Sequence, residues 1–234
     1  DYILNGQKTF ITNGTQADMV IVASRTTPEK GSKGITLFAV ETGMPGFTRG
    51  RKLDKVGQPE ADTAELFFED VRVDESAIIG EVDRGFIHMM TLLPQERISV
   101  AVANLAHARR ILEDTVEYAK ERKQFKQPIA EFQGVQFMLA DMAMKLETAR
   151  QMVYVAAAKS ERDDADLSFF GAAAKCYASD VAMEITVDAV QLLGGAGYTQ
   201  DFAAERMMRD AKITQIYEGT NQIQRLVISR SLAK

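Results

Sequence analysis

The pattern of apolar and polar residues changes character near residue 80. Before that point, short runs rich in β-branched and aromatic residues alternate with turn-forming segments. Their spacing predicts a small antiparallel sandwich or barrel, because alternating βαβ units would need helical stretches between the strands. Asn5-Gly6 predicts a tight hairpin turn, since this pair readily takes positive φ angles. The predicted strand runs are 2–4, 8–11, 19–23, 35–40 and 63–68.

From Gly85 onward, apolar residues recur at helical spacing. Pro94 is expected to kink or split the first helix, and the Gly-rich segment 194–197 to end the third. Short connections between the helices predict an antiparallel four-helix bundle. The predicted fold class is therefore α+β, with a partial β domain over residues 1–80 and a helical domain over residues 81–234. The predicted helices cover about 85–121, 135–161, 168–193, 201–208 and 220–232.

Composition removes several classes of function. The net charge of −5 disfavours nucleic-acid binding, and no apolar run approaches the length of a membrane span. Cys176 is the only cysteine, so an internal disulfide is impossible, and the two histidines belong to no cluster at metal-ligand spacing. The chain is thus expected to hold no metal and to work in a reducing compartment.

The richest local chemistry lies in residues 215–222, where Glu218 stands between an aromatic residue and a glycine. A general base that removes a weakly acidic C–H proton needs poor solvation, which raises its pKa, and nearby backbone donors. Glycine allows close backbone approach, and Thr220-Asn221 suits a helix N-terminus. Taken alone, the stretch favours a simpler interpretation, in which Glu218 is a solvated carboxylate that caps the last helix.

Seven segments, in order along the whole chain, change that balance. Together they resemble the acyl-CoA dehydrogenase family, the FAD enzymes that introduce the α,β double bond into acyl-CoA thioesters. They are Asn5–Gly14, Phe68–Val73, Pro94–Arg97, Glu121–Phe125, Phe132-Gln133, Gln191–Gly195, and Met208–Lys212 running into Tyr217–Thr220.

The resemblance implies a middle β domain that faces flavin, a C-terminal four-helix bundle and a role in fatty acid β-oxidation. It also implies that the chain begins inside the middle domain, so that the family's N-terminal helical domain and first flavin-binding segment are not in it. Most such proteins are homotetramers. A homo-oligomer, acyl-CoA as substrate and an electron-transfer flavoprotein as acceptor are therefore expected.

Two glutamates match base positions of different family branches. Glu218 matches the base of the largest branch. Glu96 matches the base of another branch, which usually has glycine where this chain has Glu218. The hypothesis is that Glu218 is the base and Glu96 a modulator or substitute, and that the two carboxyls titrate as a unit if they meet in a poorly solvated pocket.

The resemblance also assigns binding residues. For substrate, Arg97, Tyr217 and Gly219 match positions near the thioester, and Ser32 lies in a loop that approaches CoA in relatives. Lys126 is a departure, because the family usually has glycine there, so the loop is in doubt if it needs positive φ. The residues that match FAD contacts are Phe10, Ile11, Thr12, Arg122, Gln124, Phe125, Phe132, Gln133, Gln191, Gly194, Gly195, Thr220, Asn221 and Gln222.

Three alternatives remain open from the sequence. An acyl-CoA oxidase would differ by reacting with oxygen. A non-catalytic fragment would bind acyl-CoA or only assemble into oligomers. The compartment is open between bacterial cytoplasm, which is preferred, and the mitochondrial matrix, and the acyl chain length is not readable.

Overall fold

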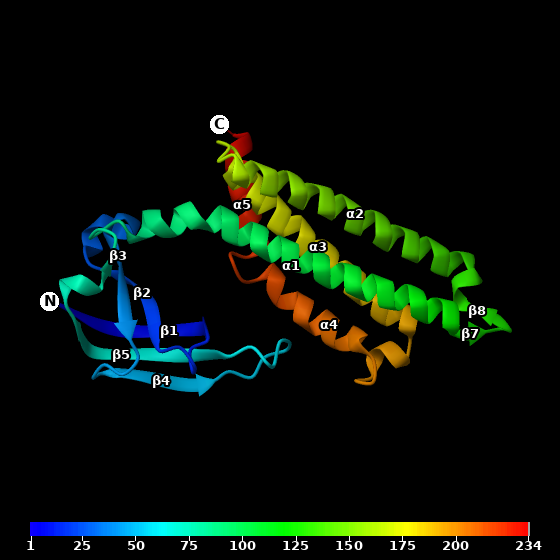
Figure 1. The fold of residues 1–234 in the computed structure, drawn as a ribbon, viewed down its shortest axis with the longest axis horizontal. Helices are drawn as coiled ribbons and strands as arrows, with labels where there is room; N and C mark the ends of the chain where they lie inside the picture. Colours follow the sequence, from blue (N-terminus) through cyan, green and yellow to red (C-terminus); the bar gives the residue numbers. More distant parts are fainter. Residues whose placement is uncertain (234) are drawn as a thin grey trace. The chain divides into compact units, whose positions relative to one another are not determined.

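A computed structural model describes residues 1–233 of the chain. The chain divides into two compact units, the first from Asp1 to Leu92 and the second beginning at Leu93. Antiparallel sheets make up most of the first unit, and antiparallel helices make up the second (Figure 1). The predicted α+β fold class is confirmed. The boundary between these two units falls within the first helix.

The first unit contains two three-stranded antiparallel sheets. One has the strand order β1-β5-β4, and the other has the order β2-β3-β6. Alternate side chains from both sheets, among them Leu66, Phe68, Phe38 and Val40, form one buried core, as a sandwich requires. The strands are β1 (Tyr2–Thr12), β2 (Met19–Arg25), β3 (Ile35–Glu41), β4 (Phe47–Lys52), β5 (Thr63–Val73) and β6 (Ile78–Ile79).

The hairpin predicted at Asn5-Gly6 is wrong. Residues on both sides of it belong to the single strand β1 and pair with the same partner, β5. The register shifts between Leu4 and Gly6, so the pair forms an irregularity within the strand. The Asn5 amide exchanges two hydrogen bonds of 2.9 Å with Asp70, one to its side chain and one from its backbone N–H. This pairing across the strands satisfies the polar groups that a hairpin turn would otherwise use.

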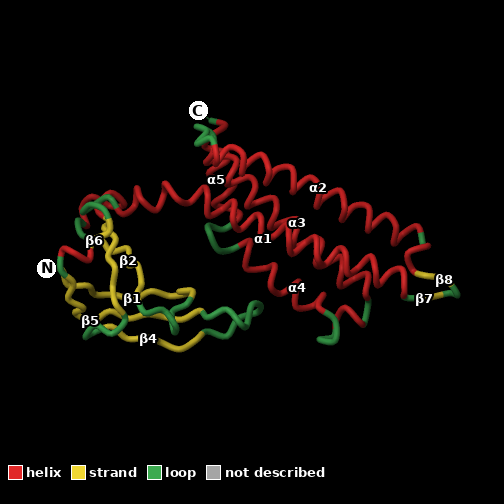
Figure 2. The backbone as a smooth tube through the Cα atoms, in the orientation of Figure 1, coloured by secondary structure: helices red, strands yellow, loops and turns green. Residues whose placement is uncertain are grey.

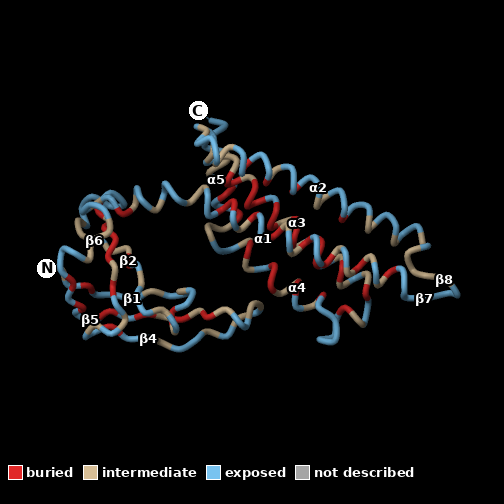
Figure 3. The backbone as a smooth tube through the Cα atoms, in the orientation of Figure 1, coloured by how far each residue is buried: buried red, intermediate tan, exposed pale blue. Residues whose placement is uncertain are grey.

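The second unit is built around α3, which packs against α2, α4 and α5. Residues from α1, α2, α3 and α4 share one apolar core, which includes Ile111, Met142, Ile185 and Met207. Figure 2 shows the helices side by side, and Figure 3 shows buried positions along their facing sides. The helices are α1 (Gly85–Glu121), α2 (Gln133–Glu161), α3 (Leu167–Leu193), α4 (Ala203–Lys212) and α5 (Asn221–Leu232).

Pro94 was expected to kink or split the helix; α1 continues through it as one element, so there is no split. Proline removes one N–H donor, but its fixed φ is a helical value and the turns on either side continue. Gly171 of α3 lies directly against this position, where a Cβ atom would be 2.9 Å from the Pro94 carbonyl oxygen. The small residue thus permits close packing of α3 against α1. The predicted stop of α3 is confirmed, because Gly194 follows its last residue with a φ of 61°.

A short hairpin joins α1 to α2, formed by β7 (Lys123–Gln124) and β8 (Gln127–Pro128). The two turn residues between them, Phe125 and Lys126, have φ angles of 49° and 70°. A two-residue hairpin of this hand requires positive φ at both central positions. The doubt raised by Lys126 is therefore answered: the backbone takes the left-handed conformation without the glycine that relatives usually have.

Candidate active site

Glu218 lies in a loop of residues 216–220 that precedes α5, here called the catalytic loop after the candidate base that it carries. Its backbone is left-handed, with a φ of 53°, and Gly219 follows with a φ of 86°. Glycine suits the second position because other residues are strained at this φ, and a Cβ atom there would also press on Nε2 of Gln224, 2.7 Å away. The turn is strained at Glu218, and such strain persists only where the surroundings hold the backbone in place.

Two buried side chains hold this turn. The Gln224 amide Nε2 donates to the carbonyl oxygens of Glu218 and Gly219, each at 2.9 Å. The Lys175 ammonium, from α3, donates to the same Gly219 oxygen at 2.8 Å and to Oδ1 of Asn221 at 2.9 Å. Gln224 and Lys175 have no exposed surface. The backbone on the C-terminal side of Glu218 is thus fixed from inside the bundle.

The start of α5 is also anchored. The Thr220 hydroxyl accepts a hydrogen bond from the Ile223 N–H, as the predicted N-cap. The Asn221 amide donates to Ser179 and to Asp180, and Asp180 in turn accepts from Arg225 at 2.7 Å. These bonds connect α5 to α3 just behind the catalytic loop.

The Glu218 carboxyl is partly buried, and this burial is the largest cause that raises its pKa. Glu96 of α1 raises the pKa further, through its negative charge and a side-chain hydrogen bond, whereas Arg97 and Lys175 lower it. The structure therefore brings together the two glutamates that the sequence singled out. A carboxylate with a raised pKa in a partly dry setting is a stronger base than one in water.

Arg97 is the third charged group of the cluster. Its side chain is buried, and its Nε has no hydrogen-bond partner among residues 1–233. Burial lowers the pKa of the guanidinium, while the charges of Glu218 and Glu96 raise it. A buried cation with an unused donor beside Glu218 suits recognition of a polar or negatively charged group.

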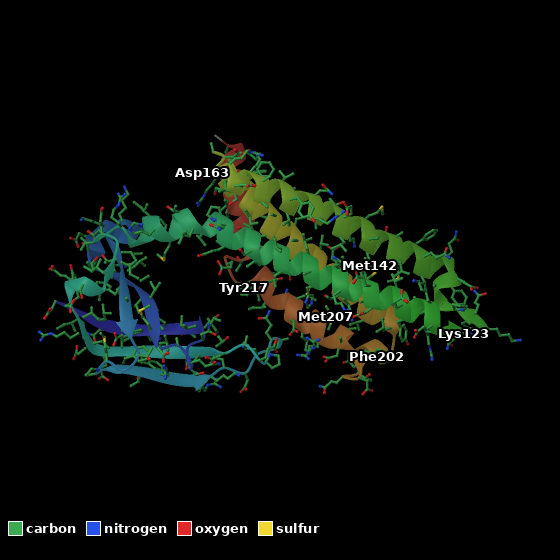
Figure 4. The ribbon with its side chains drawn as sticks, viewed as in Figure 1. Lys123, Met142, Asp163, Phe202, Met207 and Tyr217 are labelled. Carbon is green, nitrogen blue, oxygen red and sulfur yellow. The ribbon has the colours of Figure 1, made fainter. Side chains whose placement is uncertain are left out.

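The candidate cofactor residues of the second unit fall into two groups. Thr220, Asn221 and Gln222 lie beside Glu218, near Arg97 of α1. The other group lies at the opposite end of the bundle, as the positions of Tyr217 and Lys123 in Figure 4 show. Glu121 is roughly 36 Å from Arg97 along α1, and Gln191 roughly 24 Å from Lys175 along α3. This opposite group, here called the far-end group, contains Arg122, Gln124, Phe125, Phe132, Gln133, Gln191, Gly194 and Gly195.

The far-end group is held together by local contacts. The Tyr118 hydroxyl donates to the Leu193 carbonyl at 3.4 Å, which joins the last turns of α1 and α3. The rings of Phe125 and Phe132 lie edge to face, 6.1 Å apart. Gln191 and Glu218 therefore lie far apart within one chain. Sequence spacing alone could not show this, because the distance between them depends on the directions in which the helices run.

In the first unit, the β1 register shifts again between Lys8 and Ile11, and Phe10 has a φ of 61° within this irregularity. The Phe10 ring is 76% exposed, an unusual state for a large aromatic side chain. Ile11 is partly buried and Thr12 ends the strand. Ser32 is exposed in the short helix η1 (Pro28–Gly34).

Several of these groups fit a bound FAD. Arg122 is exposed and has no ion-pair partner in the part of the chain that is described, so its planar fork is free to pair with a phosphate. The Phe125 ring is 87% exposed, and nothing lies within 4 Å of a Cβ built at Gly194 or Gly195. An anionic ligand with a flat ring system could bind such an unpaired cation, the exposed aromatic rings and the uncrowded backbone at the two glycines.

Within residues 1–233, no group of histidine, cysteine, aspartate and glutamate side chains could hold a metal ion. In the same range, no helix has the length and apolar character needed to cross a membrane. Cys176 is buried, as a small core residue would be.

Two residues of the site were not found from the sequence. Lys175 and Gln224 lie in helices, where a charged or amide side chain is usually solvated. The available signal was context: Lys175 stands between Ala174 and Cys176 in an Ala-rich helix, one turn before Ser179. A polar side chain in such apolar surroundings indicates a buried partner.

Comparisons with known proteins agree with this geometry. Residues 1–71 match the family model of the acyl-CoA dehydrogenase middle domain, and residues 83–233 match that of the C-terminal domain. The chain is 53% identical over 233 residues to probable acyl-CoA dehydrogenase FadE25 of Mycobacterium tuberculosis, covering all of this chain and 60% of that protein. The chain belongs to the acyl-CoA dehydrogenase family and spans about three fifths of the length of the relatives it matches.

Solved structures give the same result. Butyryl-CoA dehydrogenase from Megasphaera elsdenii has a TM-score of 0.96 at 48% identity, covering all of this chain and 61% of that one. A chain in the structure described as the electron transferring flavoprotein of Acidaminococcus fermentans has a TM-score of 0.96 at 51% identity, with coverage of 100% and 61%. PigA with FAD and proline has a TM-score of 0.96 at 33% identity, with coverage of 99% and 60%.

Proposed function

We propose that the protein carrying this chain is an FAD-dependent acyl-CoA dehydrogenase in which Glu218 removes the α-proton of an acyl-CoA thioester. One observation carries the proposal. The Glu218 carboxyl is partly buried in a left-handed turn, and burial together with Glu96 raises its pKa. Family membership supports the reaction class, and the arrangement of this chain's own residues supports the choice of base.

The proton step follows from the loop geometry. A carboxylate on a backbone held by Gln224 and Lys175 has little freedom, so its oxygen can be kept near one carbon atom. The Glu218 N–H makes no backbone hydrogen bond among residues 1–233, which leaves it available to a thioester carbonyl. A donor at that oxygen makes the α-proton more acidic.

When bound, FAD supplies the hydride acceptor for the hydrogen that leaves the β-carbon. The residues that would hold FAD are Phe10, Ile11 and Thr12 in the first unit, and in the second unit the start of α5 and the far-end group. Phe10 offers a stacking face, and Arg122 offers a fork for the pyrophosphate. Because the far-end group and Glu218 lie at opposite ends of one bundle, a single FAD that contacts both would bind residues from two copies of the chain.

Arg97, Tyr217, Gly219 and Ser32 would contact the substrate. Arg97 is the strongest of these, because its buried Nε has no partner in the described part of the chain. Its positive charge also favours the ionised form of Glu218. Glu96 is proposed as a modulator that shares the site with the base.

Replacing each glutamate separately tests the assignment. In the FAD-loaded protein, Glu218→Gln is expected to reduce acyl-CoA-dependent dye reduction by at least about 10³-fold, because the proton acceptor is lost. Glu96→Gln should retain turnover and shift the acidic limb of its pH profile to lower pH, since a negative charge that raises the pKa of Glu218 is removed. Turnover that survives Glu218→Gln but not Glu96→Gln would reverse the two roles.

The electron acceptor and the assembly belong to the same proposal. We propose that electrons pass to an electron-transfer flavoprotein and that the protein is a homo-oligomer. Dye or flavoprotein reduction without hydrogen peroxide formation would support a dehydrogenase, whereas oxygen consumption would indicate an oxidase. A colourless protein that cannot be reconstituted with FAD would indicate a non-catalytic scaffold.

A further inference from the structure

We propose that Lys175 is a positioning residue for Glu218, which fixes the catalytic loop through hydrogen bonds and supplies a buried positive charge that favours the ionised base. The inference rests on the proposed role of Glu218. It concerns a residue of α3 that lies outside the segments from which the family resemblance was drawn.

The geometry shows that Lys175 is a bridge between α3 and the catalytic loop. Its Nζ lies 2.8 Å from the Gly219 oxygen and 2.9 Å from Oδ1 of Asn221. It therefore holds both the residue after the base and the first residue of α5. Together with Gln224, it fixes a turn whose left-handed Glu218 would otherwise relax.

The charge of Lys175 is unusual for a structural lysine. Its side chain has no exposed surface, and the two oxygens it contacts are both neutral. Asp180, the carboxylate nearest along α3, is paired with Arg225 at 2.7 Å. A buried ammonium without a carboxylate partner lowers the stability of the fold. We therefore expect the charge of Lys175 to have a function that offsets this cost.

Lys175 can lose its positive charge and still make its two hydrogen bonds to the loop. An ammonium has three N–H donors, and Lys175 uses two of them on the loop. A neutral amine still has two N–H groups and could keep both bonds. Loss of the proton would therefore remove the charge near Glu218 and leave the loop in place.

Charged groups of α1, α3 and the catalytic loop act on this pair. Burial is the main cause that lowers the pKa of Lys175 to about 8, and Arg97 of α1 lowers it further. Cys176 and Asp180 on α3 and Glu218 on the loop act in the opposite direction. In turn, Lys175 lowers the pKa of Glu218, against the effects of burial and Glu96.

A first test measures stability without activity. The pKa of Lys175 is about 8 in the folded protein and 10.5 for a free lysine, so between these values the unfolded chain binds more protons than the folded one. Folding stability from Lys175 should therefore increase as pH rises from 8 towards 10.5. Lys175→Met should remove this increase, and the matched helix variant Thr186→Val should keep it. A rise of equal size in Lys175→Met would overturn the inference.

A second test uses the FAD-loaded protein and an acyl-CoA substrate. Lys175→Met is expected to lower kcat by about 10- to 100-fold with little change in KM, because the base is displaced rather than the substrate. The acidic limb of its pH profile should move to higher pH, since a charge that lowers the pKa of Glu218 is gone. Lys175→Gln keeps an amide donor but no charge, so it should show the same movement with a smaller loss of kcat.

Control variants distinguish failure of the Lys175 inference from failure of the proposed function. Thr186 is buried in α3 and bonds only to carbonyls of its own helix, so Thr186→Val should lower stability without moving the pH limb. If Lys175→Met and Lys175→Gln both leave kcat and the limb unchanged while Glu218→Gln is inactive, the Lys175 inference fails and the proposed function stands. If Glu218→Gln is active, the proposed function fails by itself.

Discussion

At the residue scale, backbone strain and candidate chemistry coincide. Nine non-glycine residues of the described chain have positive φ angles, among them Phe10, Phe125 and Glu218. All three are candidate site residues from the sequence. Left-handed backbone costs roughly 1–2 kcal/mol for such residues and persists only where neighbouring contacts hold it.

Lys126 provides a test of that cost. Its φ of 70° is required by the two-residue turn between β7 and β8, and a glycine would adopt it without a Cβ clash. Lys126→Gly is expected to raise the free energy of unfolding by about 0.5–1 kcal/mol, part of the strain being offset by the greater freedom of glycine in the unfolded chain. Urea unfolding at constant m-value measures the difference.

The matched control is Lys126→Ala, which removes the charged side chain and keeps the Cβ atom. It should not stabilise the protein. A stabilisation equal to that of Lys126→Gly would assign the effect to the charge or length of lysine and would contradict the backbone explanation.

At the element scale, the Asp83 carboxylate connects several segments around η1 through hydrogen bonds. The Asp83 carboxylate accepts hydrogen bonds from Thr26 and Thr27 at 2.8 Å and from Lys30 at 2.7 Å. The backbone N–H of Asp83 donates to the Thr36 hydroxyl at 2.8 Å. Lys30 is the main cause that lowers the pKa of Asp83 to about 2, and the two threonines add to it. The loop that carries Ser32 is therefore fixed to the start of β3.

Asp83→Asn is expected to lower the thermal midpoint of the protein at pH 7. Asparagine tolerates the positive φ of this position, so the change removes the charge and leaves the backbone conformation accessible. Because the pKa of Asp83 is lower when folded, its contribution is present above about pH 4 and is lost as the pH falls towards 2. Thermal scans at pH 7 and pH 3 should show a smaller difference at the lower pH.

Asp54→Asn is the control, because Asp54 is exposed and contacts Arg51 only at 3.9 Å. It should leave the midpoint unchanged at both pH values. A difference between Asp83→Asn and the original protein that grows as the pH falls would contradict the assignment.

At the scale of the whole molecule, the separation of the two groups of cofactor residues has a consequence. Tyr217, the neighbour of Glu218, lies at one end of the helical unit, and Lys123, the neighbour of Arg122, lies at the other (Figure 4). If a single FAD contacts both groups, each site is built from two chains. Variants at the two ends then affect different halves of each site.

Mixing two inactive variants tests this arrangement. Glu218→Gln and Arg122→Ala chains, each with low activity alone, are expected to recover activity when co-expressed. Random pairing makes half of the dimers mixed, and each mixed dimer has one intact site, so activity should approach about a quarter of the original. Steady-state dye reduction by the co-purified protein gives the value, and no recovery would place both groups in the same chain's site.

Much of the fold could be predicted from patterns of residues that are close together in the sequence. The change from period-2 to helical spacing near residue 80 separated the β-rich and helical parts, and Gly194 ended α3 where expected. Met142, Ala149 and Val153 of α2, which recur at helical spacing, are buried. These features depend on neighbours within a few residues, so periodicity and the φ freedom of glycine decide them. The same locality made Glu218 visible, because its aromatic and glycine neighbours adjoin it in the chain.

Tertiary structure decided what depends on distant partners. Asn5-Gly6 became an irregularity in β1 because Asp70, 65 residues away, pairs with it. Glu96 meets Glu218, and Lys175 reaches Gly219, only because α1, α3 and the catalytic loop pack together. Sequence by itself determined which residues could carry the chemistry, since side-chain type and local spacing are written in it. Their grouping and protonation were set by packing, because burial and charge act through space.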